Sequence, residues 1–374
     1  MRRLSSLLRH RLRTVLAGAD RGNIALLVTI VLGGGVLLGA GALSVDVGQL
    51  YAEREQLQSG ADAAAMAVAQ NCIRTPAACG NQNAPAVSYA NRNAKDGASA
   101  VTLICGRATG LAGCPAPTGN RWDCMGAPPP AGPYAEVRTA TLQPDGSTLL
   151  PPTFAQTLVG NQGYKGARLA ACSRVAWGPP LQATGLGVTV STCDWQRVTG
   201  GAPAYLPPGT LPPASAEGVL YLHSTSGANT CPAGPSGWDA PGGFGWLDDP
   251  TNTCSSTVAA NGTYGGDSGL APSKACSAAL ASLYTTHTPV LMPIFDGVRG
   301  TGQNTVYHLS GFSSFVLTGY NLPSTNSPAS WLTGRTYCTG SAKCLYGYFV
   351  TAILPTGGSF GTIDYGTEIL KVVG

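Results

Sequence analysis

The sequence predicts an α+β protein in which a long N-terminal transmembrane helix precedes a disulfide-rich, mostly β exterior region. Three observations lead to this prediction. An uncharged apolar run covers residues 24–45, an alanine-rich helical pattern continues from it to residue 70, and twelve cysteines all lie between Cys72 and Cys344. The chain has 374 residues, of which 51 are glycine and 28 proline, a composition that favours many turns and few helices.

The apolar run at residues 24–45 is long enough to cross a membrane. A helix of this length extends for about 33 Å, which matches the hydrocarbon core of a bilayer. A cleavable signal peptide is the alternative, because Ala40-Gly41-Ala42 offers a small-residue cleavage site. The run is longer than a typical signal core, and the helical pattern continues past the possible cut. We therefore expect a retained anchor.

The charges on the two sides of this run predict its orientation. Six arginines and one aspartate precede Ile24 and give the head a net charge of +5, whereas no lysine or arginine lies between Asp46 and Glu53. Positive flanks remain cytoplasmic, so the N-terminus is expected inside and the rest outside the plasma membrane. Without the head, the chain's net charge of +4 becomes −1, which argues against a nucleic-acid surface. The arginines of the head are Arg2, Arg3, Arg9, Arg11, Arg13 and Arg21.

Two features of the predicted helix indicate what it contacts. Gly35 and Gly39 have the small-xxx-small spacing that lets two membrane helices approach closely, so self-association through this face is one possibility. Beyond the membrane, a narrow apolar stripe recurs at three- and four-residue steps. We expect this stalk, residues 46–70, to pack against another helix or against its own exterior domain. The stripe consists of Val47, Leu50, Leu57, Ala61, Ala64 and Val68.

The cysteines predict disulfides rather than a metal site. An even number of them, all on the expected exterior side, is typical of an oxidising compartment. Zinc sites need closely spaced cysteine pairs or nearby histidines, and the four histidines are scattered. Connectivity stays open, but proximity favours three pairs: Cys338–Cys344, Cys72–Cys79 and Cys254–Cys276.

Charge, hydropathy and predicted secondary structure divide the chain into five segments. Residues 1–23 form the basic cytoplasmic head, 24–45 the transmembrane helix, 46–70 the stalk, 71–179 a mixed α/β region, and 180–374 a β-rich, disulfide-pinned domain. Within 71–179 we expect a short helix near 87–93, strands near 101–105 and 134–138, and a partly helical segment at 153–175. Later strands are expected near 186–190, 219–223, 290–295, 305–318 and 345–354.

No motif in the chain predicts a reaction. Gly266-Asp267-Ser268-Gly269 is similar to the nucleophile segment of chymotrypsin-like proteases, but His223 lacks the sequence context of that family's base. Asp248-Asp249 could serve glycoside hydrolysis, although adjacent aspartates before a proline are more typical of a turn. Tryptophans such as Trp238 and Trp246 could stack on a ligand, but core packing beside disulfides is the commoner role. We predict no catalytic residues, metal ligands or cofactor.

The first seventy residues resemble the TadE/TadG-like family of the tight-adherence (Flp) pilus assembly system. The resemblance rests on Arg21-Gly22 before the apolar run, on Val45-Asp46-Val47-Gly48 after it, and on Ala61-Asp62-Ala63-Ala64-Ala65. The remainder resembles exterior parts of actinobacterial members more loosely. The resemblance implies a pilin-like helix and a single-pass envelope protein that works with other pilus or secretion-system membrane proteins and has no catalysis of its own.

Two departures from the family limit what the resemblance implies. Processed pilins of this system carry a glutamate five residues after the cleaved glycine, and Leu27 stands there when counting from Gly22. The D-x-S-x-S metal motif of some members does not occur. The sequence therefore predicts a membrane-anchored structural component of a Tad-type pilus or related envelope apparatus. An anchored or secreted extracellular binding or adhesion module is the alternative.

Overall fold

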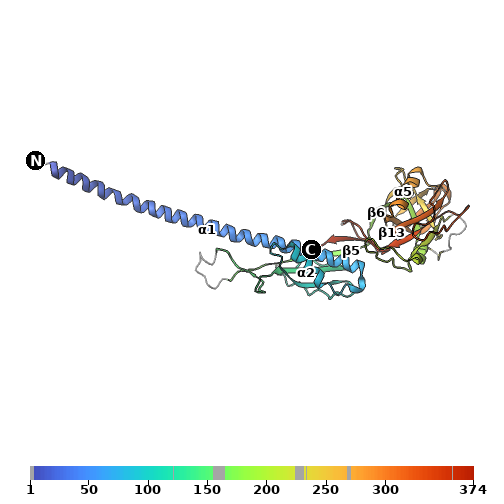
Figure 1. Ribbon diagram of the computed structural model, residues 1–374, viewed down its shortest axis with the longest axis horizontal. Coiled ribbons are helices and arrows are strands. Elements are labelled where there is room, and N and C mark those ends of the chain that lie inside the picture. Colours follow the sequence, from blue (N-terminus) through green and yellow to red (C-terminus); the bar gives the residue numbers. More distant parts are fainter. Residues whose placement is uncertain are drawn as a thin grey trace.

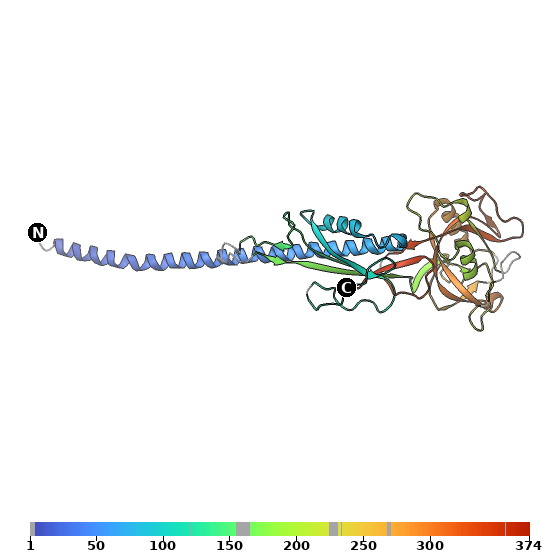
Figure 2. The same cartoon turned by 90° about the horizontal axis from the view of Figure 1, so that it is seen from below.

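A single long helix and two β units give the protein its elongated shape. The computed structural model describes residues 4–120, 122–154, 165–223, 231–232, 234–267, 271–355 and 357–374, with side chains from residue 24 onward except at 303. Helix α1 (Leu4–Arg74) has 71 residues, a length of about 107 Å. Its N-terminal part projects alone, its C-terminal part lies along the first β unit, and the second β unit lies beyond its end (Figure 1, Figure 2).

The first β unit is an antiparallel sheet packed against the C-terminal part of α1. The apolar stripe expected on the stalk is buried from Leu57 onward, and Ala61, Ala64 and Val68 are fully buried. Ala64 and Val68 pack with Val137 and Val175 of the sheet, and Leu57 and Ala61 pack with Ala171, so the helix covers its own domain. Small side chains allow close packing, as where the α carbon of Gly60 faces the backbone of Ala90 in α2 (Asn83–Asn93).

The strand order of this first sheet is β1-β2-β5-β17-β16, and every pairing is antiparallel except β16–β17. A separate two-stranded arm, β3 with β4, extends from it along α1. The bounds are β1 (Ser99–Arg107), β2 (Tyr134–Thr141), β3 (Leu149–Leu150), β4 (Ala167–Arg168), β5 (Ala170–Gly178), β16 (Ala352–Ile353) and β17 (Thr367–Val372).

The second β unit is built on an eight-stranded sheet of order β11-β9-β7-β12-β13-β15-β8, with β14 paired to β13. An additional pairing of β11 with β13 closes β11, β9, β7, β12 and β13 into a ring. The bounds are β7 (Val188–Ser191), β8 (Gly218–Tyr221), β9 (Phe244–Leu247), β11 (Thr263–Asp267), β12 (Val290–Arg299), β13 (Val306–Leu322), β14 (Thr325–Asn326) and β15 (Cys344–Val350); a further pair is β6 (Gln182–Leu186) with β10 (Ser255–Ala259).

Two short helices pack on this second unit, and both have N-caps that explain where they begin. The Ser191 hydroxyl accepts from the Asp194 amide at the start of α4 (Thr192–Thr199), and the Ser273 hydroxyl accepts from the Cys276 amide at the start of α5 (Lys274–Thr286). Three short 3₁₀ turns complete the described elements: η1 (Pro76–Ala78), η2 (Ala214–Ala216) and η3 (Gly302–Asn304).

The chain returns to the first sheet at its C-terminal end. Strand β17 begins at residue 367, 189 residues after β5 ends at residue 178, yet Ile369 pairs with Gly178 and Val372 with Val175. The second unit is therefore inserted between two neighbouring strands of the first. This arrangement makes two chain connections between the units, at residues 178–182 and 350–367.

The expected cysteine pairs are confirmed, and three more are present. Cys72–Cys79, Cys254–Cys276 and Cys338–Cys344 are bonded as proximity predicted. The others are Cys105–Cys114, Cys124–Cys172 and Cys193–Cys231, so all twelve cysteines are paired.

Two secondary-structure predictions need correction. The segment 153–175 was expected to be partly helical, but its described residues include β4 and most of β5, and 155–164 lie outside the described residues. Alanines that suit a helix are used in β5 because small side chains fit beneath α1, and strand pairing on both edges outweighs the helix propensity. The strand expected at 186–190 is interrupted at Gly187, which separates β6 from β7.

Candidate functional site

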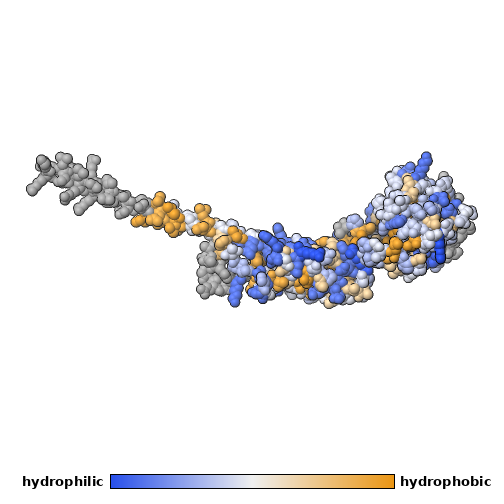
Figure 3. Space-filling model, in the orientation of Figure 1, coloured by the Kyte–Doolittle hydropathy of each residue, from blue (hydrophilic) through white to orange (hydrophobic). Residues whose placement is uncertain are grey.

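The projecting part of α1 exposes a continuous apolar surface. Within the described residues, one helix is long and apolar enough to cross a membrane, and its most apolar 18-residue window has a mean hydropathy of 2.3 with none of it buried. Val36, Leu37 and Leu38 are at least 70% exposed. Figure 3 shows this apolar band on the helix, outside the folded body. Such exposure is unfavourable in water and favourable in a bilayer.

Directly after this apolar band, Asp46 holds the β3–β4 arm against the helix. Its Oδ1 accepts hydrogen bonds from the backbone N–H groups of Thr153 at 2.8 Å and Phe154 at 3.0 Å. The Asp46 side chain is buried, with a relative exposure of 8%. One turn further along, the Thr153 hydroxyl bonds to Oε1 of Gln49 at 2.7 Å. We call these contacts the arm latch.

Further contacts fix the same helix to the sheet. The Thr139 hydroxyl donates to the backbone carbonyl of Leu57 at 2.8 Å, and Nε2 of Gln58 donates to the carbonyl of Cys172 at 3.0 Å. Gln58 Nε2 also bonds Asp62 within the helix at 3.0 Å. Leu57 and Asp46 are about 16 Å apart along the helix axis. The arm therefore extends the region in which the first β unit contacts α1 by this distance, towards the apolar band.

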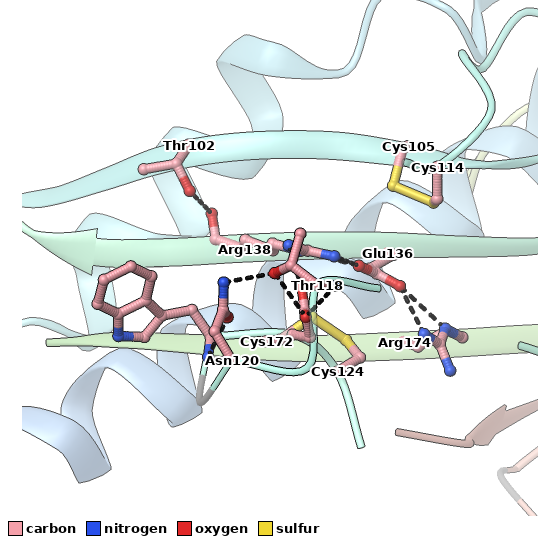
Figure 4. A network of polar contacts seen from close by, with 12 residues as sticks. Thr102, Cys105, Cys114, Thr118, Asn120, Cys124, Glu136, Arg138, Cys172 and Arg174 are labelled. Atoms are coloured by element: carbon pink, nitrogen blue, oxygen red, sulfur yellow. Dashed lines mark hydrogen bonds and ion pairs between the residues drawn. A yellow bond between two sulfur atoms is a disulfide. The ribbon is translucent and has the colours of Figure 1, made fainter. Parts of the chain in front are cut away.

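The other face of the first sheet carries a buried ion-pair network (Figure 4). The Glu136 carboxylate, 1% exposed, accepts from Arg138 Nη2 at 2.8 Å and from Arg174 Nη2 at 2.7 Å. Arg138 Nη1 continues the network to Asp123 at 2.7 Å. Desolvation opposes ionisation of Asp123, but hydrogen bonds from Thr118 and the Arg138 charge together hold its pKa below the usual value.

This network fastens a long loop over the sheet rather than forming a metal site. The loop after β1 is tied down at two points, by the disulfides Cys105–Cys114 and Cys124–Cys172. In the described part of the chain, the two clusters of metal-ligand residue types are Glu136 with one or the other of these cysteine pairs. Sulfurs in disulfides offer no thiolate, so neither cluster suits a metal.

The residues considered for catalysis are dispersed over the second unit. His223 Nε2 lies 2.6 Å from the Tyr307 hydroxyl, and burial lowers the pKa of His223. Gly266 and Asp267 end strand β11, whereas Ser268 and Gly269 of the same string lie outside the described residues. Asp249 accepts from the amide of Cys254 at 2.5 Å, as expected of a turn. Trp246 is buried in the core, as expected of a structural tryptophan.

The other two histidines of the second unit have different partners. His287 stacks on Trp331 with ring centroids 3.9 Å apart. His308 Nδ1 lies 2.5 Å from Asp296 Oδ1 and packs beside Trp238. Among the described residues, none of these histidines forms a hydrogen bond, ion pair or ring contact with another histidine or with Asp249.

A second polar cluster, not anticipated from the sequence, surrounds Glu217. Its carboxylate accepts from the hydroxyls of Thr318, Ser330, Thr333 and Tyr337, with Ser330 at 2.5 Å and Tyr337 at 2.6 Å. Burial alone would raise the pKa of Glu217, but these four hydroxyls together hold it below the usual value. The partners are 101 to 120 residues away in sequence, so local patterns gave no signal for the cluster.

Comparison with known proteins assigns the N-terminal segment. Residues 22–71 match the family model of the TadE/G-like Flp pilus-assembly domain. The match covers the exposed apolar band, Asp46 of the arm latch and most of the part of α1 that packs on the sheet. No curated protein and no solved structure is significantly similar to the chain.

Proposed function

We propose that this protein is a membrane-anchored, non-catalytic structural component of a Tad/Flp-type pilus assembly system or a related envelope apparatus. The observation that carries the proposal is the coincidence of the family match at residues 22–71 with the one exposed, membrane-length helix of the described chain. The helix is the single-pass anchor in the plasma membrane, the arginine-rich head is cytoplasmic, and both β units lie outside.

The arm latch supports a rigid connection between anchor and exterior domain. Asp46 is the first residue after the apolar run. When the helix spans the bilayer, its partners Thr153 and Phe154 therefore lie at the exterior surface of the plasma membrane. The first β unit then stands directly on the membrane, and α1 and the second unit extend away from it. A component of this shape presents its second unit to other assembly proteins at a fixed distance from the membrane.

Deletion of the gene in the native host tests this role. We expect loss of surface pili and of adherence, and restoration of both by the wild-type gene. Complementation with a gene in which a cleavable signal sequence replaces residues 24–45 distinguishes an anchored structural component from a secreted binding or adhesion module. Restoration by this released form would favour a secreted binding or adhesion module. Unchanged pili in the deletion strain would contradict the pilus role.

Self-association through the membrane helix is a second part of the proposal. An added Cβ at Gly35 or Gly39 meets no protein atom within 4 Å, so both glycines face outward from the described chain. A Gly39→Leu variant should lower the cross-linked dimer fraction in membranes, because leucine prevents close backbone approach. Gly41→Leu, on a different face of the same helix, is the matched control. Equal cross-linking in both variants would contradict dimerisation through this face.

A further inference from the structure

The cavity where the two β units meet is lined by Arg74, Asp364 and Glu368, and one buried polar atom of Arg74 and one of Glu368 make no hydrogen bond among the described residues. It has a volume of about 590 Å³, within the range of small-molecule sites. The end of α1 and strand β5 form one side, the segment Gly201–Tyr205 forms another, and the C-terminal segment with Asp364 and Glu368 forms the third. The cavity therefore lies at the connection through which the chain returns to the first sheet.

Glu368 is the first of these groups. Its side chain is 7% exposed, and its Oε2 has no hydrogen-bond partner among the described residues. Burial raises the pKa of Glu368 to about 9, with a further contribution from the neighbouring carboxyl of Asp364. The side chain of Glu368 is hydrogen-bonded to that of Asp364, and both residues line the cavity.

Arg74 is the second group, at the C-terminal end of α1. Its guanidinium lies over the ring of Tyr205, 5.4 Å from the centroid. Its Nε is buried and makes no hydrogen bond, and none of the ion pairs between described residues includes Arg74. A guanidinium with free donors in a concave site is suited to a carboxylate, which it binds with two parallel hydrogen bonds.

We propose that this junction cavity binds a small zwitterion of the amino-acid or dipeptide class, with its ammonium group at Glu368 and Asp364 and its carboxylate at Arg74. Such a ligand supplies a donor to the unpaired carboxyl oxygen and an acceptor to the unpaired guanidinium in one molecule. A neutral sugar could form hydrogen bonds to both but would leave the charge of Arg74 without a counterpart in a partly desolvated site. This inference does not depend on the pilus role.

The ligand would also lie beside the connection between the two units. Gly366, between the two carboxyl residues, has φ +84°, and an added Cβ there would lie 2.1 Å from Pro203 of the second unit. The cavity wall thus includes a close contact between the C-terminal segment and the second unit. A ligand that bridges Arg74 and Glu368 would join the end of the anchor helix to this segment.

Calorimetric titration of the full-length protein in detergent micelles tests the proposal. The probes are alanylalanine, its N-acetylated form, which has no ammonium group, and its C-terminal amide, which has no carboxylate. We expect heat from alanylalanine and about ten- to hundredfold weaker binding after either end is blocked, the usual effect of losing a charge-assisted hydrogen bond. Equal binding of all three probes, or no binding of alanylalanine, would overturn the proposal.

Two variants assign the ends of the ligand. Arg74→Gln should remove the preference for the free carboxylate over the amide, and Asp364→Asn should remove the preference for the free amine over the acetylated form. The matched controls are Arg92→Gln and Glu55→Gln, which should retain both preferences. The Arg92 guanidinium lies outside the cavity, 5.7 Å from the centroid of the Tyr89 ring, and Glu55 is exposed. If calcium or a neutral sugar binds the wild-type protein and alanylalanine does not, the cavity is not a zwitterion site and the proposal is overturned. If a variant fails to fold, the comparison of alanylalanine with its acetylated and amidated forms on the wild-type protein still tests the proposal.

Discussion

Replacement of Asp46 should release the β3–β4 arm from the helix without unfolding the protein. The Asp46 carboxylate accepts from two backbone N–H groups, at 2.8 Å from Thr153 and 3.0 Å from Phe154. Beyond this latch the described strands β3 and β4 pair with each other and with no other strand. The arm therefore depends on the latch for its position along α1.

The size of the effect follows from these two bonds. A hydrogen bond to a charged group contributes about 1.5–3 kcal/mol net. Because one carboxylate serves both amides, we expect Asp46→Ala to lower the local free energy of opening by about 2–4 kcal/mol. This corresponds to amide exchange that is about 30-fold to several-hundred-fold faster.

Hydrogen exchange read by mass spectrometry on the full-length protein measures this. Peptides that contain the amides of Thr153 and Phe154 should exchange faster in Asp46→Ala, while peptides from β5 and β13 should be unchanged. Asp62→Ala is the matched control, since Asp62 lies on the same helix and makes an exposed bond to Gln58. Unaltered exchange at Thr153 and Phe154 in Asp46→Ala would refute the latch. So would an equal effect of Asp62→Ala.

Three further predictions concern stability. Glu136→Gln should lower the free energy of unfolding by about 3–5 kcal/mol in urea titrations, because Arg174, 3% exposed, loses its buried counter-charge; the exposed Glu55→Gln should change it by less than about 0.5 kcal/mol. Removing Cys124–Cys172, which closes a 48-residue separation, should cost about 4 kcal/mol, against about 2 kcal/mol for Cys338–Cys344 with a separation of 6, and equal losses would contradict the loop-entropy argument. The lowered pKa of Glu217 means that its stabilisation is present above the pKa of the unfolded state and is lost as pH falls through the folded value. Thermal melts of Glu217→Gln and wild type should therefore differ at pH 7 and converge as the pH falls below the lowered pKa of Glu217, and a constant difference would argue against the hydroxyl cluster.

Local patterns in the sequence predict the parts of this fold that depend on neighbouring residues. The apolar run, the stalk stripe and the cysteine pairs separated by 6, 7 and 22 residues are all local, and all are present. The long strand β13 was also predictable, because its aromatic and β-branched residues suit a pleated surface.

Features that join distant residues were not predictable in this way. Strand β5 resembles a helix in composition, and its pairing with β17 becomes visible only when the C-terminal end returns to the sheet. The arm latch joins Asp46 to the backbone amide of a residue 107 positions away. The sequence shows that Asp46 belongs to the pattern that resembles the TadE/TadG-like family, but it does not show which amide this side chain binds. The junction cavity combines residues near positions 74, 203 and 368, and no spacing along the chain brings these together.

We expect the apolar helix to be retained as an anchor for a fully disulfide-bonded exterior domain. Intact mass spectrometry of the protein extracted from its native membrane, with and without reduction, tests this most directly. We expect a mass that includes residues 24–45 and a gain of twelve hydrogens on reduction, one for each cysteine. A chain that begins near Leu43, or a mass that does not change on reduction, would contradict it.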